Sequence, residues 1–97
     1  MKTSEAFRRV KRVIKSRVHS YICWAAIDVL PLADADRVTG VVLRLLNGNS
    51  SLETWLYRNH GVDLDTSAYS PNGQARMQVT RLAWLDHLIE HYESLGD

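Results

Sequence analysis

The chain has 97 residues, enough for a single domain over 1–97, and a composition of 45% hydrophobic and 24% charged residues excludes a disordered chain. No apolar run reaches the roughly 18 residues of a membrane span, and the single cysteine, Cys23, excludes an internal disulfide, so we expect a cytoplasmic protein. The net charge of +1 conceals a separation of charge: residues 1–20 hold seven basic residues and one acid, whereas the rest of the chain holds five arginines and ten acids.

The first predicted helix begins at Thr3 or Ser4, either of which can cap it, with Glu5 in its first turn. At 100° per residue, its apolar side chains fall on one side of the helix: Ala6, Phe7, Val10, Val13, Ile14, Val18 and Tyr21. The opposite side is basic. The pattern therefore predicts an amphipathic helix with a basic outer face.

Residues 21–30 are apolar on almost every side and predict a helix in the interior, which Pro31 ends and in which Asp28 is the one charge. Asp34 is the predicted cap of a third helix, which Gly48 ends. The apolar positions of this helix follow helical spacing: Val38, Val41, Val42, Leu45 and Leu46.

Ser50 and Glu53 have the spacing of a capping box and predict a short helix that ends at Gly61. Its inward side chains are Leu52, Trp55 and Leu56. Residues 62–70 are typical of a loop, and Ser70 with Pro71 predicts the start of a last helix over about 71–94. The sequence thus predicts an all-α fold, a compact bundle of four to five helices with a long C-terminal helix.

Three tryptophans, Trp24, Trp55 and Trp84, fall on the inward sides of three different predicted helices. We expect them to share one core. The alternative is that one of them is exposed and anchors a partner, because tryptophan is common among the residues that dominate binding energy.

Two motifs resemble metal sites. His87, Glu90 and His91 form the H-x-x-E-H pattern of inverted zinc peptidases, but only six residues follow His91, too few to supply the usual downstream third ligand. Residues 63–67 begin like a calcium loop, yet Ala68 and Gln74 replace the required glycine and glutamate. No nucleophile with a paired base is evident, so we expect a protein that is not an enzyme and has no catalytic residues, metal or cofactor.

Residues 35–59 have the spacing of a helix-turn-helix. The second helix offers Tyr57, Arg58 and Asn59 for contacts to bases or phosphates, but it also carries Glu53. A small DNA- or RNA-binding regulator is therefore an alternative function, and its binding should weaken steeply with salt.

Three segments carry a resemblance to known proteins: the Tyr-Ile-Cys-Trp-Ala-Ala-Ile run at 21–27, Leu-Glu-x-Trp-Leu at 52–56 and Gln-x-x-Arg-x-x-Trp-Leu-x-His-Leu-Ile at 78–89. Together they resemble an uncharacterised family of small accessory proteins of tailed phages and prophages, with Ala26 as one departure. The resemblance implies no catalytic residues. It implies a phage context, in which proteins of this size often bind a host protein stoichiometrically.

These observations favour a non-enzymatic phage-type protein that binds and inhibits or redirects a host protein in the bacterial cytoplasm, in host takeover or counter-defence. A structural or assembly component is a further alternative, and a chain this short would gain stability from homodimerisation. The partner-binding residues we expect are Arg8, Arg9, Arg12 and Lys15, which would meet an acidic patch on a protein.

Two pairings follow from the helical wheels. Arg81 lies in the apolar arc of the last helix, and we expect it to contact Asp28 as a buried ion pair. The last helix also carries a row of acids, at Asp86, Glu90, Glu93 and Asp97, which could neutralise part of the basic face if the first and last helices are antiparallel.

Overall fold

The computed structural model of the chain describes residues 1–17, 21–46, 52–64 and 73–97. These residues contain no strand and form five helices, α1 (Thr3–Ser16), α2 (Ile22–Val29), α3 (Leu32–Leu46), α4 (Leu52–His60) and α5 (Gln74–Ser94). The predicted all-α class and the long C-terminal helix are confirmed.

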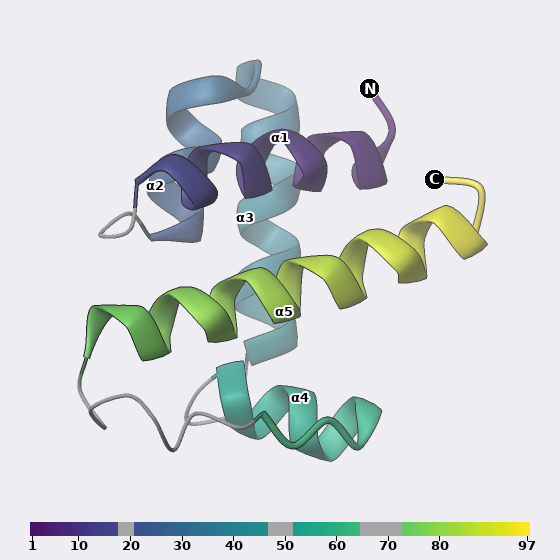
Figure 1. The fold of residues 1–97 in the computed structure, drawn as a ribbon. Helices are drawn as coiled ribbons and strands as arrows, with labels where there is room; N and C mark the ends of the chain where they lie inside the picture. The colour runs from purple at the N-terminus through teal and green to yellow at the C-terminus, as the bar shows by residue number, and fades with distance from the viewer. Residues whose placement is uncertain (18–20, 47–51, 65–72) are drawn as a thin grey trace.

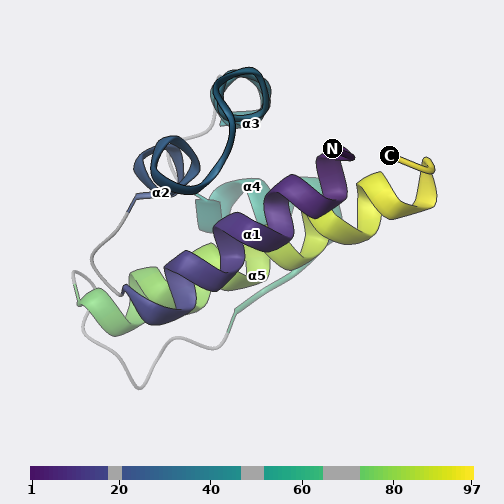
Figure 2. The same cartoon turned by 90° about the horizontal axis from the view of Figure 1, so that it is seen from above.

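The fold is built on an antiparallel pair of helices, α1 and α5, which make the most extensive helix contact among the described residues (Figure 1). Helix α3 crosses this pair steeply in the same view. Seen from above, α2 and α3 lie together on one side of the pair (Figure 2). Helix α4 packs against α5. This arrangement leaves the outer face of α1 uncovered by any other described helix.

The N-terminus of α1 is capped by a residue distant in sequence. Asp97 accepts hydrogen bonds from the Thr3 amide at 3.1 Å and the Thr3 hydroxyl at 2.8 Å, and its backbone carbonyl accepts one from the Ser4 amide at 2.8 Å. Gly96, with a φ of 75°, provides the left-handed turn that brings Asp97 there. The prediction that Thr3 or Ser4 caps the helix is therefore wrong: the N-cap position is Lys2, and its side chain makes no capping bond.

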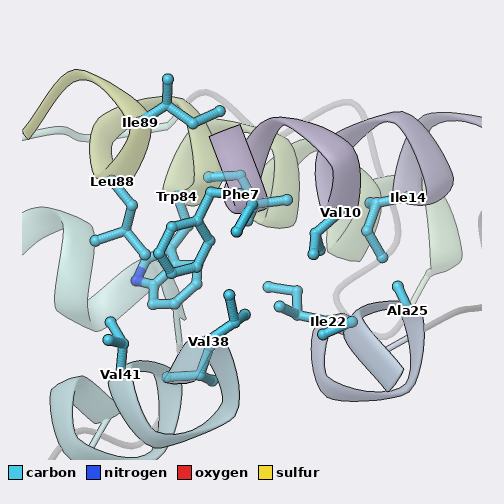
Figure 3. Close-up of a cluster of buried hydrophobic side chains, with 14 of the residues drawn as sticks. Phe7, Val10, Ile14, Ile22, Ala25, Val38, Val41, Trp84, Leu88 and Ile89 are labelled. Atoms are coloured by element: carbon cyan, nitrogen blue, oxygen red, sulfur yellow. The ribbon is translucent and has the colours of Figure 1, made fainter. Parts of the chain in front are cut away.

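The core lies where the inner faces of α1 and α5 meet α2 and α3 (Figure 3). Phe7 and Trp84, both fully buried, meet edge to face with 6.4 Å between ring centroids, and Trp55 of α4 meets Trp84 at 5.7 Å. Such aromatic pairs add stability beyond the apolar area that they bury. Trp55 and Trp84 thus share the core, but the prediction that all three tryptophans do so is wrong for Trp24, which is exposed on α2.

Helix α2 departs from its prediction. It ends at Val29, just ahead of Pro31 as expected, but only Ile22, Ala25 and Ala26 of the helix are buried. The opposite side faces outward, so the prediction of a helix buried on all sides is wrong. Small alanines on the inner face let the helix pack closely against α1 and α3. No other described helix packs extensively on the outer face of α2, so that face stays exposed.

Helix α3 begins three residues earlier than predicted. The Pro31 carbonyl accepts the Ala35 amide at 2.9 Å, which makes Pro31 the cap and places Asp34 in the first turn, where the helix dipole favours an acid. Asp34 also binds Arg37 at 2.7 Å. The predicted stop at Gly48 lies outside the described residues.

Gly61 ends α4 as predicted, with a φ of 65° and with the hydrogen-bond pattern of a left-handed helix terminus. Ser50, Pro71 and most of the predicted loop at 62–70 lie outside the described residues. Glu53 is within the described part, and its carboxylate binds Arg76 of α5 at 2.7 and 2.9 Å and accepts the Thr80 hydroxyl at 3.2 Å. The predicted capping-box glutamate therefore ties α4 to α5.

Candidate interaction surfaces

The four predicted partner-binding residues all lie on the exposed side of α1, but they differ in how their charges are compensated. Arg8 forms an ion pair with Glu93 of α5, and Arg9 pairs with Glu5 one turn away at 3.3 Å. Arg12 and Lys15 are exposed, and neither makes an ion pair with any described residue. We call Arg12 and Lys15 the basic crest.

The antiparallel arrangement of α1 and α5 neutralises part of the basic face, which confirms the pairing expected between the first and last helices. Besides the pair of Arg8 with Glu93, Lys11 of α1 pairs with Asp86 of α5. Asp97 does not join this seam, because its carboxylate binds Thr3. The uncompensated charge of the basic face thus lies in the second half of α1.

A charged groove runs between α1 and α5. It has a volume of about 580 Å³, a basic wall on α1, and a wall on α5 that is acidic apart from Ile89. Its lining residues are Arg8, Lys11, Arg12, Lys15, Asp86, Ile89, Glu90 and Glu93. A groove with walls of opposite sign has little net attraction for a long polyanion, because an anion drawn to one wall is repelled by the other.

A second hollow, of about 370 Å³, lies between α1 and α2 and is lined by Glu5, Arg9, Arg12, Val13 and Val29. Arg12 borders both hollows, which places it at the top of the ridge formed by α1. A ligand on either side of α1 can therefore reach its guanidinium group.

The exposed side of α2 carries an apolar stripe, which we define as Tyr21, Trp24 and Ile27. Their exposed fractions are 58%, 66% and 59%. Trp24 and Ile27, three residues apart, lie on one face of the helix, and Tyr21 is the N-cap residue directly before it. Trp24 is therefore the exposed tryptophan of the three, and its role as an anchor for a partner stays a prediction.

The predicted ion pair between Arg81 and Asp28 is wrong. Asp28 is more than half exposed and binds Arg17 at 3.1 Å. Arg81 is buried on α5, where its guanidinium lies 5.3 Å from the centre of the Tyr21 ring. Burial lowers the pKa of Arg81 below its ordinary value, with a smaller opposing effect from Tyr21. Asp28 points away from the core because α2 turns its alanines inward.

The two histidines of the H-x-x-E-H motif are joined by a third that the motif does not contain. The His60 ring, at the end of α4, lies 4.8 Å from the His87 ring and 4.8 Å from the Trp55 ring. Desolvation, then the charges of His87 and His91, lower the pKa of His60 below its ordinary value. Across the described ranges, no set of three or more His, Cys, Asp or Glu side chains is placed to hold a metal ion.

None of the remaining sequence motifs forms a complete binding or catalytic site within the described residues. The calcium-like segment at 63–67 lies largely outside the described residues. In the predicted helix-turn-helix, Tyr57, Arg58 and Asn59 are all exposed on α4, and the turn at 47–51 is outside the described residues. Cys23 is half-buried on α2. No helix in the described part of the chain has the length and hydropathy needed to cross a bilayer.

Comparisons with models of known protein families, with curated proteins and with solved structures found no match to this chain. Its function is therefore argued from its own residues.

Proposed function

We propose that this chain is a small non-enzymatic protein of the phage or prophage type that binds a host protein in the bacterial cytoplasm and inhibits or redirects it. The contact is made by the basic crest, Arg12 and Lys15, with Arg9 at its edge. The supporting observation is that these two side chains are exposed and lack an ion-pair partner among the described residues, whereas Arg8 is engaged by Glu93.

The charge around the crest favours an acidic patch on a protein over a nucleic acid. Glu5 lies on one side of Arg12, and the acidic wall of the charged groove, including Glu90, lies on the other. A phosphate backbone long enough to bind with useful affinity would pass over these acids. A compact acidic patch contacts the crest alone, and such complementarity gives both specificity and fast association.

A nucleic-acid-binding regulator remains the second candidate. It is favoured by the exposure of Tyr57, Arg58 and Asn59 on one helix, where the charge of Glu53 is compensated by Arg76. Its binding surface would be α4, which is distinct from the crest on α1, so the two candidates are separated by variants.

The test is capture from nuclease-treated host lysate, at low and high salt, with the wild-type chain and three variants. The variants are Arg12→Glu with Lys15→Glu, Arg58→Glu, and Arg44→Glu as a matched control on an exposed site of α3. We expect that a host protein is captured, that this capture persists after nuclease treatment and weakens with salt, and that it is lost only in the crest variant. Loss of all capture on nuclease treatment, or loss in Arg58→Glu alone, would overturn the proposal in favour of nucleic-acid binding.

A further inference from the structure

The apolar stripe on α2 is large for the surface of so small a protein. Trp24 has 66% of its surface exposed, more than its flanking stripe members, and Leu32, at the start of α3 just beyond the stripe, is 79% exposed. These four side chains together offer roughly 400 Å² of apolar area. An exposed apolar area of this size within one short segment commonly marks an interaction site.

The area matches what a dimer interface requires. A specific interface buries about 800 Å² on each partner, of which a little over half is non-polar. The stripe and Leu32 supply nearly all of that non-polar share from one segment of twelve residues, 21–32. The polar rim would then come from neighbours of the stripe, such as the ion pair of Asp28 with Arg17.

The charge beside the stripe points to the occupant. Asp28 follows Trp24 by one helical turn and is compensated by Arg17 at 3.1 Å, so the stripe lies beside a neutral ion pair. Exposed cations without an ion-pair partner among the described residues lie elsewhere, including the basic crest of α1 and Arg44 and Arg58 on α3 and α4. An acidic partner is therefore drawn to those sites, whereas the stripe suits a partner that is apolar and locally neutral. A second copy of this stripe is such a partner.

We propose that the chain forms a two-fold symmetric dimer through the apolar stripe of α2, with Leu32 at its edge. In an antiparallel arrangement centred on α2, Trp24 of each copy faces Ile27 of the other, so one contact is made twice, as two-fold symmetry requires. This surface is separate from the basic crest, which stays open in the dimer for the host protein proposed above. The inference does not depend on that proposed function.

The test is the mass of the full chain in solution, by sedimentation equilibrium or by light scattering after gel filtration, over about 1–300 µM, the range in which interfaces of this size associate. We expect a mass rising to twice that of the chain. Trp24→Ser and Ile27→Ser should each raise the dimer dissociation constant by about 30-fold or more, as loss of a central anchor does. Leu43→Ser, on α3 and 65% exposed, is the matched control and should leave it unchanged.

Circular dichroism of each variant checks that it is folded. Trp24 and Ile27 are both exposed in the monomer, so neither substitution opens a cavity. A wild-type chain that stays monomeric throughout this range would overturn the dimer. So would a dimer that persists in both folded stripe variants, or one that Leu43→Ser disrupts equally.

Discussion

At the scale of single residues, Phe7 of α1 packs against two aromatic rings of α5. It is fully buried, meets Trp84 edge to face and stacks on Tyr92 with 5.8 Å between ring centroids. Phe7→Ala removes both contacts and leaves a cavity, so we expect a loss of about 3–5 kcal/mol in the free energy of unfolding. Denaturant unfolding measures it, and Arg44→Ala, at an exposed site, is the control that should lie within about 0.5 kcal/mol of wild type.

Asp28 makes a different case at the same scale. Its pair with Arg17 joins two side chains that are each more than half exposed, at 56% and 53%. Solvent screening limits such pairs, so Asp28→Ala should change the free energy of unfolding by less than about 1 kcal/mol. Thermal unfolding of the variant measures this; a loss of 3 kcal/mol or more would mean that the carboxylate is buried after all.

At the scale of helices, the hydrogen bonds between Thr3 and Asp97 should make the free energy of unfolding depend on pH in the acid range. Hydrogen bonds from the backbone and side chain of Thr3 lower the pKa of Asp97 below its ordinary value. Its contribution is therefore present above the unfolded-state pKa of about 3.9 and is lost as the pH falls through the lower, folded-state value. Asp97→Asn should reduce stability at neutral pH and flatten its decline below pH 4, as read by denaturant midpoints.

The junction of α4 with α5 should respond to pH in a higher range. The pKa of His60 is lowered in the folded state, so the unfolded chain binds more protons below about pH 6.5 and stability falls as the pH drops beneath that value. The effect should be below about 1 kcal/mol, because the ring is partly solvated. His60→Gln should remove this part of the decline between pH 7 and 5. If the stability of wild type and variant declined identically between pH 7 and 5, His60 would not be the source of this pH dependence.

How far the sequence predicts each helix depends on what covers it. The periodicity of residues 6–14 predicts the buried face of α1, because α5 and α2 cover one side only. Tyr21, which the same pattern places on that face, lies beyond the end of α1 and is exposed, so that part of the prediction is wrong. Residues 21–30 contain one charge, Asp28, and are otherwise apolar, so their pattern does not define a buried face, and the packing of Ala25 and Ala26 decides which side faces inward. The cap of α1 lies beyond any local pattern, because Asp97 reaches it from 94 residues away.

At the scale of the whole molecule, the positions of the charges follow from how α1 and α5 pair. The sequence predicts that the outer side of α1 is basic, but it cannot predict which charges are compensated, since that depends on the relative register of two distant helices. The register engages Arg8 with Glu93 and leaves Arg12 and Lys15 without ion-pair partners among the described residues. The candidate site thus centres on two of the four basic residues that the sequence predicts, Arg12 and Lys15.

The central claim is that Arg12 and Lys15 bind an acidic protein patch. Its most direct measurement is the affinity of the purified host protein for the wild-type chain and for Arg12→Glu with Lys15→Glu, by isothermal titration calorimetry at two salt concentrations. We predict at least a tenfold loss of affinity, about 1.4 kcal/mol, and a smaller salt dependence in the variant, with Arg44→Glu unchanged. Equal affinity and equal salt dependence in a folded crest variant would contradict the claim.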